Sequence, residues 1–234
     1  MSLSELFPID RWNFSTRSIL NVLSDEDYRY LISNRTNERY QRGDVIFREG
    51  SVPSGIFLIV SGRIKKYKVD QNGKEQVIYI ANQGELIGYH AILSEERYPD
   101  SAAALESCVV SFIPKEDFME ILHRSPFLTQ RLLKAMSHEF TVLSNSISVL
   151  AHRSAAERLA IALIVLREKF KEEGVQKEVL INISRSDLAN IAGIAQENVV
   201  RILKEFKSEH ILETHGRNIS IKNIKLLVKR TNYK

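Results

Sequence analysis

The distribution of glycine divides this chain into modules of different composition. Seven of its ten glycines lie between Gly43 and Gly88. Short segments rich in β-branched and aromatic residues alternate with them, and Asn72-Gly73 is a typical hairpin turn. These segments are VIFREG (45–50), GIFLIVSG (55–62), RIKKYKV (63–69) and QVIYIA (76–81). Many short strands separated by glycine turns predict a compact antiparallel sandwich or barrel, which we expect over about residues 36–113.

Two further segments complete this module. Residues 14–36 interleave apolar and polar positions, and we expect them to be helical. After Pro99, AAALE (102–106) and VVSFI (109–113) are expected to form another strand pair. Cys108, in the second of these strand patterns, is best explained as a core residue.

A long segment without glycine or proline follows the β module. Residues 115–124 can form a short helix, and Pro126 stands where a new helix can begin. From Phe127 to His152 an apolar stripe recurs at spacings of three and four: Leu132, Met136, Phe140, Leu143, Ile147 and Leu150. Such a stripe is typical of a two-helix seam, so we expect a dimer interface; the alternative is a helix packed on its own sheet.

The C-terminal part contains two short helices separated by a glycine. Residues 154–170 predict a core helix that ends near Gly174. Within 184–212, Ser184 and Asp187 resemble a capping box, and Gly193 supplies a turn before a second amphipathic helix with Val199, Ile202, Leu203 and Phe206 as its buried stripe. Helix, glycine turn and helix with a polar outer face is the helix-turn-helix pattern.

The polar face of the second helix suits the DNA major groove. It offers Gln196, Glu197, Asn198, Arg201 and Lys204. Arginine can donate two hydrogen bonds to guanine, and glutamate can accept one from cytosine. Glu197 and Arg201 are four residues apart and can also pair with each other. A simple surface ion pair is the alternative interpretation of these two residues.

Positive charge is concentrated in this C-terminal part. Residues 154–234 carry 15 Lys and Arg against 10 Asp and Glu, whereas residues 1–153 carry 18 against 19. ILETHGRNISI (211–221) predicts a hairpin, in which Arg217 and, more weakly, His215 could contact phosphate. The imbalance indicates an anionic partner, although a solvated basic tail would also explain it.

In this order of modules the chain resembles the Crp/Fnr superfamily, the bacterial regulators related to the cyclic-AMP receptor protein. Glu197, Val199, Arg201, Ile202 and Leu203 match the family motif E-x-V-x-R-I-L. The resemblance implies an α+β fold with an N-terminal antiparallel β-roll, a long dimerisation helix and a C-terminal winged helix-turn-helix. It also implies double-stranded DNA, a second copy of the chain and RNA polymerase as partners. The expected domains are 1–125, 126–153 and 154–234.

The expected DNA contacts include two residues at the start of the motif, Ser184 and Arg185. The chain departs from the family in the second helix, where Gln196 replaces an arginine of the cyclic-AMP receptor and Ala195 replaces a common serine. Gln196 predicts a different base preference at one step. Alanine is a poor helix cap and lacks a hydroxyl that could reach phosphate.

The expected effector pocket departs further from the family. Cyclic-nucleotide binders carry a cassette in which Glu holds the ribose and Arg the cyclic phosphate. The aligned residues here are Gly88, Tyr89, His90, Asp100, Ser101 and Ala102. Tyr89 replaces the Glu and Asp100 the Arg, so a phosphate would meet a negative charge and lose its bidentate donor. An alternative alignment uses Gly84-Glu85-Leu86, with Arg97 then four residues before Ser101.

Other chemistries have little support in the sequence. One cysteine excludes an intramolecular disulfide and cysteine-cluster sites, no metal-ligand spacing occurs, and no cofactor is expected; His90 as a haem ligand is a remote alternative. No enzyme motif, signal peptide or membrane-length apolar run is present, so we expect a cytoplasmic protein. We therefore expect a DNA-binding regulator without cyclic-AMP control and with an unknown effector. The alternatives are a cyclic-nucleotide-responsive regulator with a rearranged pocket and a β-roll that only contacts proteins.

Overall fold

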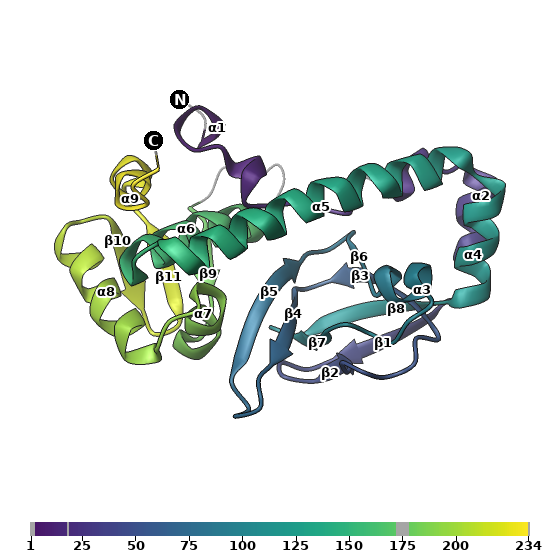
Figure 1. Ribbon diagram of the computed structural model, residues 1–234, viewed down its shortest axis with the longest axis horizontal. Coiled ribbons are helices and arrows are strands. Elements are labelled where there is room, and N and C mark those ends of the chain that lie inside the picture. The colour runs from purple at the N-terminus through teal and green to yellow at the C-terminus, as the bar shows by residue number, and fades with distance from the viewer. Residues whose placement is uncertain (1–2, 18, 172–177, 234) are drawn as a thin grey trace. The chain divides into compact units, whose positions relative to one another are not determined.

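A computed structural model describes residues 3–17, 19–171 and 178–233. They form two compact units, one of residues 14–140 and one of residues 1–13 with 141–234 (Figure 1). The architecture is α+β, as predicted, with an antiparallel β domain, a long helix and a helix-turn-helix with a small sheet. The expected domain ranges 1–125, 126–153 and 154–234 stay a prediction.

Two four-stranded antiparallel sheets form the β domain. Their strand orders are β1-β8-β3-β6 and β2-β7-β4-β5. The strands are β1 (Thr36–Tyr40), β2 (Val45–Phe47), β3 (Gly55–Ser61), β4 (Ile64–Val69), β5 (Glu75–Ala81), β6 (Leu86–Ile87), β7 (Ser101–Ala104) and β8 (Cys108–Pro114). Buried branched side chains such as Ile56, Ile64 and Val110 form the core, which explains the β-branched composition of these segments.

The predicted hairpin at Asn72-Gly73 is confirmed. It joins β4 to β5, whose last pair is Val69 with Glu75. The Asp70 carboxylate accepts the backbone N–H groups of Asn72 and Lys74 at 2.8 and 2.9 Å. Gly73 has a φ of 77°, a left-handed conformation that costs glycine little.

Two predictions for this domain were wrong. Strands β7 and β8 do not pair with each other: β7 joins β2 and β4, whereas β8 joins β1 and β3. The chain between them therefore crosses from one sheet to the other. Residues 14–36 are helical only in η2 (Leu20–Val22) and α2 (Asp25–Leu31). The extended Ser24 interrupts them because its hydroxyl caps α2 by accepting the N–H of Asp27.

The β domain is completed by α3 (Tyr89–Ser94), α4 (Lys115–Arg124) and the first part of α5 (Pro126–His152). Both α4 and α5 begin as predicted. Leu128 and Leu132 of α5 belong to the buried apolar core, together with Tyr89 and Phe118. This anchors the start of α5 to the β domain.

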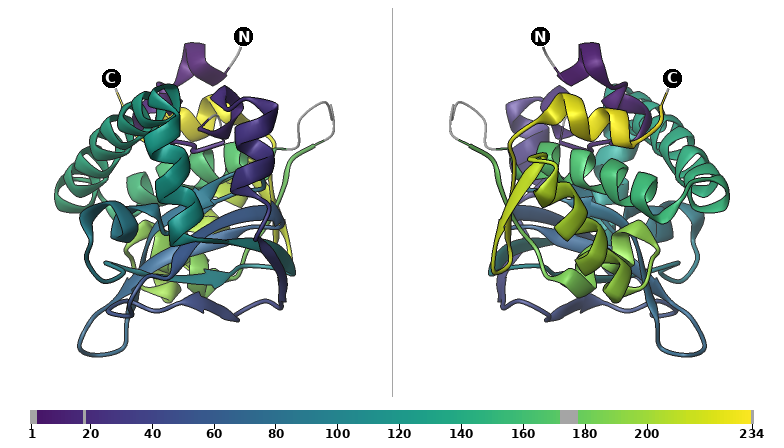
Figure 2. Two further views of the ribbon diagram at one scale, coloured as in Figure 1. Left: turned by 90° about the vertical axis from the view of Figure 1, so that its right-hand side faces the viewer. Right: turned by 90° about the vertical axis from the view of Figure 1, so that its left-hand side faces the viewer.

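The C-terminal unit is a winged helix. Helix α6 packs on the helices α7, α8 and α9, and a three-stranded sheet has the order β10-β11-β9; the right-hand view of Figure 2 shows its green and yellow helices. The elements are α6 (Ala155–Phe170), β9 (Leu180–Asn182), α7 (Arg185–Ala192), α8 (Gln196–Ser208), β10 (Leu212–His215), β11 (Asn218–Ile221) and α9 (Ile224–Arg230), with α1 (Leu3–Leu6) and η1 (Ile9–Arg11) in the same unit. Ser154 and Glu157 cap α6 reciprocally. The predicted cap Gly174 lies outside the described residues.

Candidate nucleic-acid interface and effector pocket

The predicted helix-turn-helix is formed by α7 and α8. Ser184 caps α7 by accepting the N–H of Asp187 at 2.9 Å. Gly193 ends α7 with a φ of 64°, as the predicted turn requires. Ala195 occupies the cap position of α8 without a side-chain hydrogen bond. Both helices of the motif are present, and α8 begins without a side-chain cap.

Helix α8 has one buried and one exposed face. The buried side chains are those predicted: Val199, Ile202, Leu203 and Phe206. Gln196, Glu197, Arg201 and Lys204 are exposed, and Asn198 is half-buried. Charged and amide side chains along one side of the helix are therefore accessible to solvent.

The expected pairing of Arg201 with Glu197 was wrong. Arg201 lies 4.0 Å from Glu205, four residues after it, and 3.5 Å from the Asn198 side-chain oxygen. Glu205 has the same spacing from Arg201 as Glu197 and competes for the same guanidinium. The Arg201 side chain is 64% exposed, so this ion pair contributes little and leaves the guanidinium accessible.

One residue of this face was not among those predicted. Val200 is 54% exposed, although it is β-branched and lies in the middle of a helix. It stands four residues after Gln196 and four before Lys204, which places all three on one helical face. This spacing could have placed Val200 on the exposed face, but an apolar side chain is usually expected on the buried one.

The predicted wing is a hairpin of β10 and β11. Their last pair is His215 with Asn218, so Gly216 and Arg217 form the turn. His215 and Arg217 are both exposed. Arg185, an expected DNA contact, is half-buried and donates from Nη2 to the Gly216 carbonyl at 2.9 Å. In this structure Arg185 supports the wing turn.

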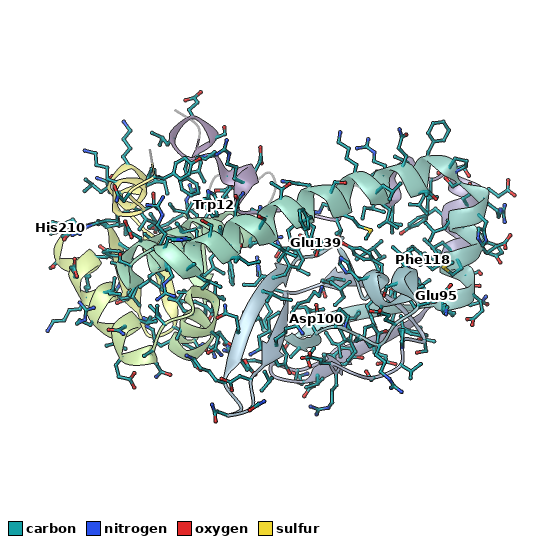
Figure 3. The ribbon with its side chains drawn as sticks, in the orientation of Figure 1. Trp12, Glu95, Asp100, Phe118, Glu139 and His210 are labelled. Atoms are coloured by element: carbon teal, nitrogen blue, oxygen red, sulfur yellow. The ribbon has the colours of Figure 1, made fainter. Side chains whose placement is uncertain are left out.

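The aligned cassette residues lie in the β domain, around the starts of α3 and β7. Gly88 has a φ of 86° and precedes α3. Tyr89 is 1% exposed, and its hydroxyl donates to the Glu139 carboxylate of α5 at 2.8 Å. The His90 Nε2 lies 2.9 Å from the same oxygen. Figure 3 labels Glu139 on α5 and Asp100 in the β domain.

Asp100 has a buried partner that the sequence did not indicate. Its carboxylate lies 3.1 Å from the Lys66 ammonium, and both side chains are at most 7% exposed. The expectation of an unbalanced negative charge is therefore corrected, because Lys66 on β4 neutralises it. The Ser101 hydroxyl accepts the Glu49 N–H at 2.9 Å, and Ala102 is fully buried.

The residues of the alternative alignment have other partners. Glu85 is 2% exposed and accepts a hydrogen bond from the Tyr79 hydroxyl. Arg97 is exposed and donates to the Gly50 carbonyl at 2.9 Å. Each of these side chains has a structural role.

The apolar stripe of α5 differs from the prediction at one end. Leu132 is only 3% exposed and belongs to the β-domain core, so it cannot be an open interface residue. Leu133 is 60% exposed and lies seven residues before Phe140, which itself lies seven before Ile147. We define the apolar stripe as Leu133, Met136, Phe140, Leu143, Ile147 and Leu150. The exposed fraction reaches 75% at Phe140 and 68% at Ile147.

Other candidate sites are structural or absent among the described residues. Cys108 is buried, and its thiol lies 3.2 Å from the carbonyl oxygens of Arg63 and Glu106. Burial raises the pKa of Cys108. Within the described ranges no three His, Cys, Asp or Glu side chains gather to hold a metal ion. No helix in these ranges has the length and apolarity needed to cross a membrane.

Comparisons with known proteins give consistent matches. Residues 37–125 match the model of the cyclic nucleotide-binding domain, and residues 157–230 that of the Crp-like helix-turn-helix domain. The fumarate and nitrate reduction regulatory protein of Vibrio cholerae is 32% identical over 184 residues, which cover 78% of this chain and 73% of that protein.

Two solved structures share the fold. FixK2 from Bradyrhizobium japonicum has a TM-score of 0.73 at 20% identity, covering 83% of this chain and 96% of its own. The c-di-GMP responsive global regulator CLP of Xanthomonas campestris also has a TM-score of 0.73, at 18% identity, covering 85% of this chain and 99% of its own.

Proposed function

The chain is a DNA-binding transcription regulator of the Crp/Fnr family, and we propose that it acts as a homodimer on a two-fold symmetric DNA site without control by cyclic AMP. The exposed face of α8 is the observation that carries the proposal. Arg201 and Glu197 would read base edges there, because arginine suits guanine and glutamate suits cytosine. Gln196, Asn198 and Lys204 would complete the contact with the bases, and Ser184, His215 and Arg217 would contact the phosphates.

Dimerisation is supported by the apolar stripe of α5. Leu133, Phe140 and Ile147 are each at least 60% exposed, and exposing such side chains to water is unfavourable. Their spacing of seven residues fits the seam of two parallel helices. A dimer would present two copies of α8, which requires a two-fold symmetric site.

Independence from cyclic AMP is supported by two buried contacts. In the family alignment Tyr89 replaces the ribose-binding glutamate, and its hydroxyl donates to Glu139. Asp100 replaces the phosphate-binding arginine in the same alignment, and it pairs with Lys66. A cyclic phosphate would have to separate this buried pair, which would leave Asp100 uncompensated.

The alternative function, a cyclic-nucleotide-responsive regulator with a rearranged pocket, has one observation in its favour. Lys66 is a buried cation beside the position where a cyclic phosphate would lie in the family alignment. Calorimetry with cyclic AMP and cyclic GMP distinguishes this alternative from the proposed function. We expect no binding at micromolar concentrations, and micromolar affinity would establish the alternative.

The DNA-binding proposal is tested by selecting genomic fragments on the purified full chain, followed by gel shift. We expect enrichment of a two-fold symmetric sequence that the protein binds without added cyclic nucleotide. Failure to enrich any symmetric sequence, with and without cell extract, would contradict the proposal.

A further inference from the structure

A buried carboxylate connects α5 to the cassette region. Glu139 is 5% exposed, whereas the other charged residues of this fully described helix are exposed. It accepts the Tyr89 hydroxyl at 2.8 Å, and the His90 Nε2 lies 2.9 Å from the same oxygen. The two rings stack at 4.1 Å, so α3 presents both groups to one carboxylate.

The surroundings keep this carboxylate charged. Burial by itself would raise the pKa of Glu139, but the hydrogen bond and charge of His90, with the charge of Lys66, lower it below its ordinary value. Burial and the Glu139 charge raise the pKa of Tyr89, so its hydroxyl stays protonated and remains a donor. Hydrogen bonds to a charged acceptor are stronger than neutral ones. A buried carboxylate also imposes a geometry, because rotating it away from its donors would leave it unpaired.

Glu139 directly precedes Phe140 of the apolar stripe. Neighbouring residues of a helix are about 100° apart around its axis. Any rotation that moves Phe140 toward or away from a partner must therefore displace Glu139 from Tyr89 and His90. The contact on one side of α5 determines which side chains the helix exposes on the other.

We propose that Glu139, Tyr89 and His90 form a latch that sets the rotation of α5 on the β domain, so that the apolar stripe faces a second copy of the chain without a bound effector. The proposal rests on dimerisation through the stripe, as proposed above. Glu139 is thus a positioning residue: it acts on the interface through Phe140 and its neighbours and does not itself contact the partner.

The experiment compares two tyrosine-to-phenylalanine variants of the full chain. Tyr89→Phe removes the hydroxyl that binds Glu139. Tyr98→Phe is the matched control, because Tyr98 is also buried and donates to a main-chain carbonyl, that of Gly55 at 3.0 Å. The dimer dissociation constant is measured by sedimentation equilibrium, and folding by thermal unfolding.

We expect Tyr89→Phe to raise the dimer dissociation constant about tenfold, the effect of losing one charge-assisted hydrogen bond. Tyr98→Phe should lower thermal stability but leave that constant unchanged. Glu139→Gln retains an acceptor oxygen, so its dimer dissociation constant should lie between those of wild type and Glu139→Ala. If Tyr89→Phe does not fold, Glu139→Gln is compared with wild type in its place. Equal dissociation constants for wild type and the folded latch variants would overturn the proposal.

Ile147→Asp separates this proposal from the one on which it rests. If Ile147→Asp remains dimeric, the stripe is not the interface and the latch proposal fails with it. If Ile147→Asp is monomeric while Tyr89→Phe dimerises like wild type, the stripe is the interface and the latch alone is wrong.

Discussion

At the scale of single residues, the exposed face of α8 combines charged, amide and apolar side chains. Arg201 is 64% exposed and weakly held by Glu205, so releasing it to bind a base costs little. Arg217 is exposed in the wing turn, and we expect its side chain to contact the DNA backbone. These two arginines should therefore have different effects on binding.

We expect Arg201→Ala to reduce the preference for the selected site over unrelated DNA by about ten- to a hundredfold, as losing a bidentate base contact does. Arg217→Ala should weaken binding to all sequences alike and reduce the salt slope by about one. The affinity of each variant for the selected site and for unrelated DNA is measured by fluorescence anisotropy over a salt series. Equal loss of preference in the two variants would contradict the assigned roles.

Val200 should read a thymine methyl group, because it is the exposed apolar side chain between Gln196 and Lys204. Replacing each thymine of the selected site in turn by deoxyuridine removes only that methyl. We expect one such replacement to weaken wild-type binding several-fold and to leave Val200→Ala unaffected. If no single replacement discriminates the two proteins, Val200 does not contact thymine.

At the scale of elements, the two helices of the motif differ in their caps. Ser184 accepts the Asp187 N–H at the start of α7, whereas Ala195 offers no acceptor at the start of α8. Both residues have extended backbone angles suited to a capping side chain. The first turn of α8 therefore lacks the stabilising side-chain cap that the first turn of α7 has.

Ala195→Ser should increase the free energy of unfolding of the C-terminal unit by about 1 kcal/mol, because serine can accept an unpaired N–H of α8. Ser184→Ala should decrease it by about the same amount. Urea unfolding followed by circular dichroism measures both. A destabilising effect of Ala195→Ser would mean that the hydroxyl does not adopt the capping geometry.

The contact between α3 and α5 should depend on pH. The folded-state pKa of Glu139 is lowered, so its stabilisation is present above the ordinary carboxyl range and lost as the pH falls through the folded-state pKa. Tyr89, His90 and Lys66 are the groups that face it. We expect the difference in unfolding free energy between wild type and Glu139→Gln to shrink from pH 7 to about 3. A constant difference would show that the charge of Glu139 is not stabilising.

At the scale of the whole molecule, α5 is the helix that continues from the β domain into the C-terminal unit. Its start is held in the β-domain core by Leu128 and Leu132. The apolar stripe lies further along the same helix, with Phe140 and Ile147 exposed, and a second copy would cover it. Oligomeric state and DNA binding are therefore expected to change together.

We expect Ile147→Asp to convert the dimer to a monomer and to reduce DNA affinity at least tenfold, because a buried unpaired carboxylate opposes association. Ser148→Asp, at the next and exposed position, is the matched control and should stay dimeric. Light scattering gives the mass and gel shift the affinity. Tight DNA binding by a monomeric Ile147→Asp would separate the two properties.

Features that depend on local patterns could be predicted from the sequence. Gly73, Gly193 and the start of α5 at Pro126 follow from turn and helix chemistry within a few residues. The buried stripe of α8 follows from helical periodicity. These features supported the fold class and the DNA-reading helix.

Features that depend on contacts between distant segments could not be predicted in this way. Lys66 reaches Asp100 from another strand, and Glu139 reaches Tyr89 from another helix. Periodicity could not assign Leu132 to the core and Leu133 to the surface, because adjacent positions fit an apolar stripe almost equally well. Packing on the β domain made that choice, since a side chain buried in its own chain cannot also face a partner.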